Sequence, residues 1–274
     1  MSTITLAAPL GLLDPRQKLP GRLVAALSDT ADVAGRNLRT LLRTPQALVF
    51  ATIQPMIFVL LFRYAFGGAI RVPGVNYVDY LMPGIFAQSV AFGAMGTAVG
   101  LSADLRSGIL VRFRTLPMAR VAVLGGRTLA DLVRNLAVVA VMIGVGFAVG
   151  FRTASGAPGL LAALALVVAF AYAASWAFMT LGLRVSDPEA AQAAGVPLVF
   201  LVFTSSAFVP LRSMPGWLQA IGAHQPVNAL VTAERALILG GPAAGDVLIS
   251  LAWSGGILIV FGLLAARAYV RMGR

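Results

Sequence analysis

The sequence predicts an all-α, polytopic membrane protein with six transmembrane helices, an amphipathic interfacial helix near the amino terminus and a short re-entrant outer segment before the last span. Hydrophobic residues make up 59% of the 274-residue chain and charged residues only 11%, and the mean hydropathy is +0.88. These values lie outside soluble globular composition. Most charges fall between long apolar runs. Because lipid offers the backbone no hydrogen-bond partner, helices are the expected structure of such runs.

Six uncharged runs are each long enough for one span of about 20 residues. They predict spans at about residues 46–64, 82–103, 132–151, 159–183, 193–211 and 247–267, within a transmembrane domain of residues 45–274. Pro55, Pro197 and Pro210 are expected to kink these helices or to mark their ends. We expect no ionisable side chain in the core of any span.

The amino-terminal region divides into a tail and a helix. Residues 1–21 are expected to be a cytoplasmic tail, because their apolar stretch has no preceding positive charge and fits a signal peptide poorly. In residues 22–44, apolar side chains recur every three or four positions and arginines occupy the other faces. This pattern predicts an amphipathic helix on the inner membrane surface. A helix packed on protein is the alternative.

The distribution of basic residues predicts the orientation. With the amino terminus inside, the inner segments hold 16 of the 21 Lys and Arg residues and the outer segments hold five. By the positive-inside rule, both termini are cytoplasmic. Arg is used almost to the exclusion of Lys, which suggests a GC-rich bacterial genome and a multi-pass protein of the bacterial cell membrane.

Several kinds of chemistry are excluded or poorly supported. The single lysine, Lys18, stands between Gln17 and Leu19, so the chain has no nucleotide-binding P-loop. There is no cysteine, and the single histidine, His224, cannot build a multi-histidine metal site and is expected to be an interface residue. Basic residues separated by apolar runs do not form a nucleic-acid surface. We therefore expect no catalytic residue, no bound metal and no nucleic-acid partner.

The inner loop of residues 104–120 has apolar side chains at helical spacing beside a row of arginines. A short amphipathic helix of this kind at the membrane edge can press its apolar face on a partner and pair its arginines with the partner's carboxylates. A positive-inside anchor without any partner is the alternative.

Residues 212–230 are predicted to form an outer re-entrant segment. Met214, Pro215 and Trp217 belong to an apolar stretch that is too short to span, and Trp suits the membrane interface. The segment is expected to form an outer gate, and a plain interfacial anchor is equally compatible.

Uncharged polar and aromatic positions inside two spans are the candidates for a substrate pathway. Such a lining suits a large, mostly apolar solute with a few polar groups. Hydrogen bonding between helices is the alternative for the Ser and Thr residues. The candidates are Gln88, Ser89 and Phe92 in the second span and Thr204, Ser205, Ser206 and Phe208 in the fifth.

Two blocks resemble the permeases of type-2 ATP-binding-cassette (ABC) exporters, in particular the daunorubicin/doxorubicin-resistance branch. The first block runs from Gly108 to Pro117 and is similar to that family's coupling region. The second covers residues 208–227 and is similar to its segment between spans five and six. The resemblance extends from about Arg36 to the end of the chain.

The resemblance implies a permease that pairs with two ATP-binding ATPase subunits and with a second permease, either itself or a paralogue. ATP and Mg would be bound by the ATPases and no cofactor by this chain. The implied cargo is an amphiphilic, drug-like or lipid-like substrate, and membrane lipid surrounds the spans. Many relatives carry Glu where Leu105 or Val111 stands here, and Asp104 can take that role. The implied coupling residues are Asp104, Arg106, Gly108, Ile109, Leu110, Arg112, Phe113, Arg114, Leu116 and Pro117.

Two other classes of protein are weighed against an exporter subunit. The first is a stand-alone ion-coupled carrier or channel, which commonly needs ionisable residues within its spans. The second is an intramembrane lipid enzyme, which needs Asp, His or Ser clustered at one membrane depth. The expected absence of ionisable groups from the spans argues against both.

Overall fold

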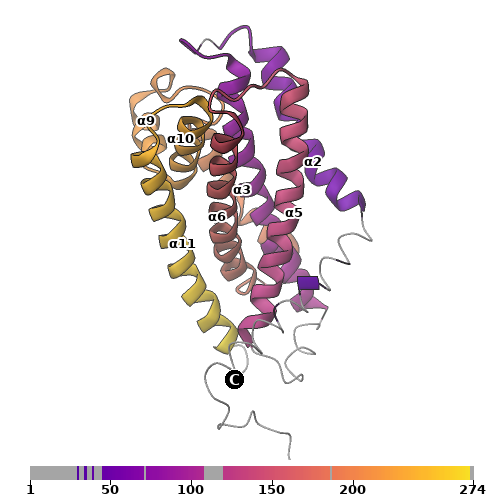
Figure 1. The fold of residues 1–274 in the computed structure, drawn as a ribbon. Coiled ribbons are helices and arrows are strands. Elements are labelled where there is room, and N and C mark those ends of the chain that lie inside the picture. Colours follow the sequence, from indigo (N-terminus) through magenta and orange to yellow (C-terminus); the bar gives the residue numbers. More distant parts are fainter. Residues whose placement is uncertain are drawn as a thin grey trace, which may run out of the picture.

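The computed structural model describes residues 30, 34, 35, 39, 45–70, 72–107, 120–185 and 187–271, and these residues form helices and connecting turns without strands. Five helices are long and apolar enough to cross a membrane, counted over the described residues. They run side by side along one axis (Figure 1). Their bounds are α2 with its π-helical extension η1 (Pro45–Leu60 and Leu61–Phe66), α3 (Tyr77–Arg106), α5 (Arg120–Ala148), α6 (Gly156–Gly182) and α11 (Ala244–Arg271).

The ends of two helices follow from local side-chain chemistry. The Asn76 side chain accepts a hydrogen bond from the Val78 N–H at 3.3 Å and so caps the start of α3. Gln225 caps α10 (Pro226–Leu239) in the same way, through the Val227 N–H at 2.8 Å. Gly240 ends α10 with a φ of 78°, a left-handed conformation that glycine adopts without a steric penalty.

The hydrophobic core lies around α6. This helix packs against α3, α5, α10 and α11, and it contains no charged residue. Fully buried side chains of α3 and α5, among them Leu81, Phe86 and Met142, join the same core cluster. In membranes, close packing of this kind holds helices together because lipid provides no hydrophobic driving force between them.

The fifth predicted span differs from a continuous span-length helix. The predicted range, residues 193–211, holds the helix α8 (Val196–Thr204), and α7 (Pro188–Ala193) precedes it, with a turn at Ala194 and Gly195 between them. Pro197 lies in the first turn of α8, where its missing N–H costs no helical hydrogen bond. The apolar run therefore contains a helix start that span counting placed inside a helix.

Three short elements precede the last span. They are η2 (Leu211–Ser213), α9 (Gly216–Ala223) and α10, and α9 and α10 lie at the end of the bundle opposite the carboxyl terminus (Figure 1). None of them has the length of a span, as the sequence predicts for residues 212–230. Whether this segment enters the outer leaflet stays a prediction.

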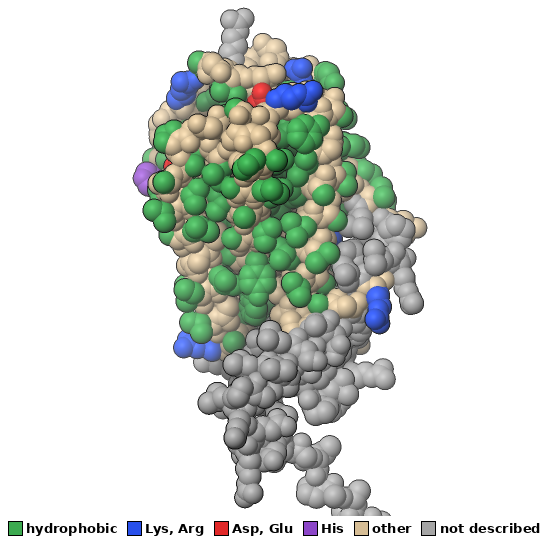
Figure 2. All heavy atoms as spheres, in the orientation of Figure 1, with side chains coloured by type: hydrophobic (Ala, Val, Ile, Leu, Met, Phe, Trp, Pro, Cys, Tyr) green, Lys and Arg blue, Asp and Glu red, His purple; other side chains and the backbone are tan. Residues whose placement is uncertain are grey.

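The outer surface matches a protein embedded in lipid. In Figure 2 the face shown is apolar over most of its height, and Lys and Arg gather near its two ends. Large side chains of α2 and α11 are exposed, including Phe50, Ile57, Leu248 and Ile259. An exposed apolar surface on this scale is unusual for a soluble monomer and ordinary for a lipid-facing one.

Charged residues lie in the first part of one span-length helix, and the expectation that the span cores hold no ionisable group stays a prediction. The apolar part of α5 that is long enough to cross a membrane runs from Gly125 to Ala148, so it includes Arg127, Asp131 and Arg134. These charges led the sequence-based boundary to be placed later, at about residue 132. The four described residues of the predicted interfacial helix, 30, 34, 35 and 39, are helical, and the rest of residues 22–44 lies outside the described residues.

Candidate functional site

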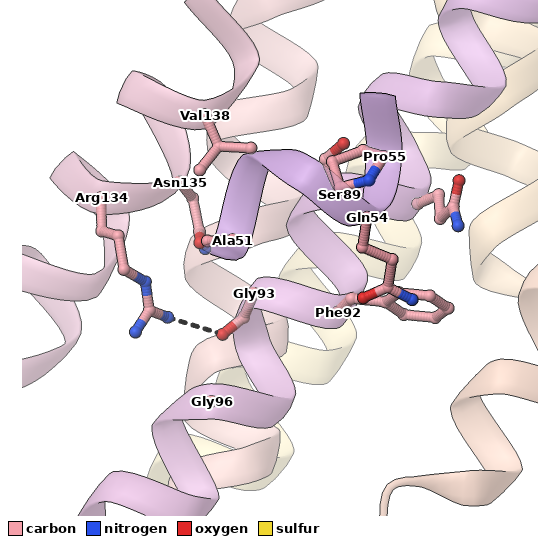
Figure 3. Close-up of a pocket in the computed structure, with 11 residues that line it drawn as sticks. Ala51, Gln54, Pro55, Ser89, Phe92, Gly93, Gly96, Arg134, Asn135 and Val138 are labelled. Atoms are coloured by element: carbon pink, nitrogen blue, oxygen red, sulfur yellow. Dashed lines mark hydrogen bonds between the residues drawn. The ribbon is translucent and has the colours of Figure 1, made fainter. Parts of the chain in front are cut away.

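A pocket of about 220 Å³ lies between α2, α3 and α5, beside the middle of α3 (Figure 3). Residues from all three helices point toward it in the close-up. The lining consists of Ala51, Gln54 and Pro55 from α2, of Gln88, Ser89, Phe92, Gly93 and Gly96 from α3, and of Arg134, Asn135 and Val138 from α5.

The three predicted pathway residues of the second span all belong to this lining. Ser89 donates its hydroxyl hydrogen to the Ile85 carbonyl oxygen at 2.7 Å, so its polar group is already used within α3. Gln88 and Phe92 stand one helical turn apart on the same side of α3. Their role as a substrate pathway stays a prediction, and the structure adds Gln54, Arg134 and Asn135 beside them.

Two buried amides of the lining are unpaired. Gln88 is 1% exposed and Asn135 is 2% exposed. Among the described residues, neither the nitrogen nor the oxygen of the Gln88 amide has a hydrogen-bond partner, and the Asn135 amide nitrogen also lacks one. Buried polar groups in folded proteins are nearly always paired, and an unpaired one costs free energy. These amides therefore mark the pocket as a place where a bound group would be stabilised.

An ion network joins α3 and α5 next to the pocket. Asp131 accepts a hydrogen bond from Thr97 of α3 at 2.8 Å and lies 3.3 Å from the Arg134 guanidinium. Arg127 pairs with Asp104 and stands 4.0 Å from Asp131. Two carboxylates thus face two guanidinium groups. This balance explains how an apolar helix carries charges, since charged residues in membranes pair with one another.

Glycines of α3 make room for the long side chains of α5. A methyl group on Gly93 would collide with the Asn135 side chain, and one on Gly100 would collide with Arg127. At Gly96 the added carbon would lie 3.2 Å from Arg134. Arg134 also donates to the Gly93 carbonyl oxygen at 2.7 Å, as Figure 3 shows. Gly96 and Gly100 are therefore positions where α3 leaves space for arginine side chains of α5.

The predicted coupling loop is described only at its start. Asp104 pairs with Arg127, which connects the first residue of the loop to the network beside the pocket. Arg106 lies 3.2 Å from Asp187, with both side chains largely exposed. The other predicted coupling residues, from Gly108 to Pro117, lie outside the described residues, and their role stays a prediction.

The predicted pathway residues of the fifth span are not at this pocket. The Ser205 hydroxyl donates to the Val202 carbonyl at 2.6 Å, and the Thr204 hydroxyl donates to the Leu201 carbonyl at 3.3 Å. Phe208 stacks on Phe62 with ring centroids 4.6 Å apart. These two hydroxyl bonds stay within one segment. The alternative, hydrogen bonding between helices, is seen at Ser206, whose hydroxyl oxygen accepts from Arg235 of α10 at 3.2 Å.

Arg235 of α10 joins segments at the end of the bundle opposite the carboxyl terminus, which the distribution of basic residues predicts to be the outer end (Figure 1). Its guanidinium carbon lies 3.6 Å from the centroid of the Tyr80 ring. Its nitrogens donate to the Tyr80 carbonyl at 3.1 Å and to the Ser206 carbonyl at 2.9 Å. Asn228 completes the cluster by accepting the Ser206 N–H at 2.9 Å. We call these residues, with Tyr77 and Phe208, the outer polar cluster.

The predicted outer-gate residues flank the start of α9. Met214 and Pro215 precede the helix, and Trp217 in its first turn is 64% exposed. The exposed His224 ring lies 3.0 Å from the Ala220 carbonyl through Nδ1. Within the described part of the chain, no three His, Cys, Asp or Glu residues gather where they could hold a metal ion.

The sequence contains a pattern that indicates the polar residues of α5, although the sequence analysis did not use it. Arg127, Asp131 and Asn135 follow one another at intervals of four residues, which places polar groups on one face of a helix. The predicted third span begins at about residue 132 and so leaves out Arg127 and Asp131. A polar stripe continuing into an apolar run is the pattern that indicates the α3–α5 interface.

Comparisons with known proteins agree with the motif blocks. A model of the family "ABC-2 type transporter" matches residues 33–239. The chain is 32% identical over 269 residues to the daunorubicin resistance ABC transporter permease protein DrrB1 of Streptomyces coeruleorubidus, covering 98% of this chain and 95% of the relative.

Two mycobacterial proteins are also similar. The Probable doxorubicin resistance ABC transporter permease protein DrrC of Mycobacterium tuberculosis is 28% identical over 258 residues, which is 93% of this chain and 94% of the relative. The doxorubicin resistance ABC transporter permease protein DrrB of the same organism is 28% identical over 196 residues, or 67% of this chain and 66% of the relative.

Proposed function

Because the chain belongs to the ABC-2 type transporter family, we propose that it is the transmembrane permease subunit of an ATP-driven exporter for a hydrophobic or amphiphilic substrate. The observation that carries the proposal is the similarity to a drug-resistance permease over nearly the whole chain. The buried pocket between α2, α3 and α5 supports it, since mostly apolar pockets with a few polar groups suit drug-like or lipid-like molecules.

The energy for transport is proposed to come from partner chains. The sequence has no P-loop, so ATP and Mg would be bound by two separate ATPase subunits at the cytoplasmic face. This chain would bind no cofactor. It would pair with a second permease, either another copy of itself or a paralogue, in the bacterial cell membrane with both termini cytoplasmic.

Coupling is proposed to pass through the loop of residues 104–120. Closure of the ATPase pair would move this loop, and Asp104 at its start is paired with Arg127 of α5. The network continues through Asp131 to Arg134, which lines the pocket. This continuity of charged contacts is what supports a mechanical link between loop and pocket. An element with two discrete arrangements, biased by both sites, is the physical requirement for such coupling.

The direct test is co-expression of the chain with candidate ATPase subunits. We expect one ATPase to co-purify, and the complex to hydrolyse ATP and lower cellular accumulation of doxorubicin, the drug in the names of two relatives. A finer test replaces Arg112 and Arg114 with Glu, which should reverse the charge presented to the ATPase. We expect lower ATP-dependent export with membrane insertion retained. Failure of every ATPase to bind would refute the exporter function.

The charged residues of α5 are one feature that a stand-alone ion-coupled carrier would also have. These residues are paired with one another and with Asp104, whereas a coupling site must release and rebind its ion. Export that continues without any ATPase and collapses with the proton gradient would favour the carrier instead.

A further inference from the structure

We propose that the pocket between α2, α3 and α5 binds a neutral part of the substrate that carries hydroxyl or carbonyl groups, and that the amides of Gln88 and Asn135 recognise these groups. This inference rests on the proposed transport function and specifies the chemistry of the same site. It starts from the unpaired amide atoms, which include both a donor and an acceptor. A ligand that pairs with them relieves a cost that the empty pocket carries.

The charges around the pocket favour a neutral ligand. Arg134 is the charged residue of the lining, and it is already engaged by Asp131 at 3.3 Å and by the Gly93 carbonyl oxygen at 2.7 Å. Asp131 in turn is shared with Thr97 and Arg127. Because Asp131 already balances the charge of Arg134, a charged ligand group would add an uncompensated charge to a mostly apolar surrounding, which is costly.

The remaining lining favours a flat or compact apolar body. Phe92 offers an aromatic ring, and Ala51, Pro55 and Val138 offer aliphatic surface. The volume of about 220 Å³ is below the range of about 300–1,000 Å³ that is usual for drug-sized ligands. The pocket therefore takes one ring system or one head group. Gln54 and Ala51 are exposed at the α2 side, where the rest of a larger ligand can leave the pocket.

Amides that lack partners give specificity as well as affinity. A site with hydrogen-bonding groups discriminates strongly against an analogue that lacks the matching group, because the buried polar atoms of the site then stay unpaired. The pocket should thus separate two aromatic molecules of equal size that differ in one hydroxyl group. A purely apolar site would bind the less polar molecule at least as well.

The test uses 2-naphthol and naphthalene, two fluorescent probes that differ by one hydroxyl group. Their binding is measured on the purified permease in phosphatidylcholine nanodiscs, with protein-free nanodiscs as the correction for partition into lipid. We expect wild type to bind 2-naphthol roughly tenfold more tightly, the factor for about one neutral hydrogen bond. The preference should disappear in the double variant Gln88→Leu/Asn135→Leu. The control variant Ser175→Ala, which loses only a bond within α6, should keep it.

The melting temperature of the protein without added ligand provides a second readout. If the amides exist for a ligand, the double variant should melt at the same temperature as wild type or higher, because Leu leaves no polar atom unpaired. A lower melting temperature would show that the amides support the fold, and equal binding of the two probes by wild type would show that they recognise nothing. Either result overturns the proposal.

The source of the ligand is distinguished by adding diacylglycerol, a neutral lipid with one hydroxyl group, to the nanodiscs. Displacement of 2-naphthol from wild type assigns the pocket to lipid head groups, and undisturbed binding assigns it to a free solute. Failure of the pocket is separate from failure of the exporter: ATP-dependent export with unchanged probe binding in the double variant removes only the pocket inference.

Discussion

The outer polar cluster and the pocket both lie against α3, but they differ in hydrogen bonding: the polar groups of the cluster are paired, and several polar atoms of the pocket are not. In the outer polar cluster, the Tyr77 and Tyr80 hydroxyls donate to the Phe208 and Ser206 carbonyls, both at 2.9 Å. Arg235 adds its bonds to the same backbone. In the pocket, about two turns further along α3, the buried amides of Gln88 and Asn135 have unpaired atoms.

This difference distinguishes polar groups that stabilise the fold from polar groups that are available to a ligand. Hydrogen bonds that are complete in the folded chain hold elements in place, and removing one partner leaves the other group buried and unpaired. Groups whose hydrogen bonds are incomplete in the folded chain cost free energy until something binds them. By this criterion the outer polar cluster stabilises the fold at the predicted gate, and the unpaired amides of the pocket fit the binding role proposed for it.

The largest effect is expected from Arg235→Ala. The substitution removes a charged group that contacts the Tyr80 ring and bonds the backbone of two segments. Losing charge-assisted hydrogen bonds and a cation–π contact should lower the free energy of unfolding by about 3 kcal/mol or more. Thermal unfolding of the detergent-solubilised protein measures the change. Arg212→Ala, an exposed arginine of the neighbouring η2, is the matched control and should have little effect.

Glu234 is the exception within the outer region. It is fully buried in α10, which is not among the span-length helices, and neither carboxyl oxygen has a partner among the described residues. Burial raises the pKa of Glu234 well above its usual value, and the neighbouring Arg235 opposes this only in part. The folded protein therefore holds this proton more tightly than the unfolded chain.

The sign of the pH dependence follows from that difference. The stabilisation is complete below the unfolded pKa of about 4.3 and is lost as the pH rises toward the folded pKa, by at most about 1.4 kcal/mol per pH unit. We expect the melting temperature of wild type to fall between pH 5 and pH 8 by more than that of Glu234→Gln, which stays neutral. Parallel curves for the two proteins would show that Glu234 does not titrate in this way.

Hydropathy predicts most of the fold because a backbone in lipid must satisfy its own hydrogen bonds, which leaves the helix as the structure for an apolar run. A segment such as α6, uncharged and mostly apolar over 27 positions, has no other stable arrangement in a membrane. The split between α7 and α8 was not predictable in the same way. Hydropathy averages over a window, and it does not detect that a proline in an apolar run begins a helix instead of kinking one.

The site was predictable only where one helix carries it. Gln88, Ser89 and Phe92 are recognisable as polar and aromatic positions of a single span. Asn135 joins them through the packing of α5 on α3, which depends on the glycines opposite its side chain. Pairing between helices is not encoded in the pattern of either helix alone, so Ser205 and Ser206 looked as suitable as Gln88. The Ser205 hydroxyl instead donates to the Val202 carbonyl oxygen, and the Ser206 hydroxyl oxygen accepts from Arg235.

The smallest effects belong to a pair of asparagines, and these test the comparison most directly. Asn228 and Asn135 are both nearly fully buried, at 5% and 2% exposure. The Asn228 side chain accepts the Ser206 N–H, whereas the Asn135 amide nitrogen has no partner among the described residues. Asn228→Leu should therefore cost about 1–3 kcal/mol, the penalty of leaving a buried N–H unpaired.

Asn135→Leu removes an unpaired group and should leave stability unchanged or raise it slightly, since a leucine of similar volume fills the same space. Both single variants are compared with wild type by thermal unfolding under identical conditions, without added ligand. Opposite signs would support the division between a structural cluster and a binding pocket. If Asn135→Leu is as costly as Asn228→Leu, the Asn135 amide is part of the scaffold, and the division fails at the residue on which it most depends.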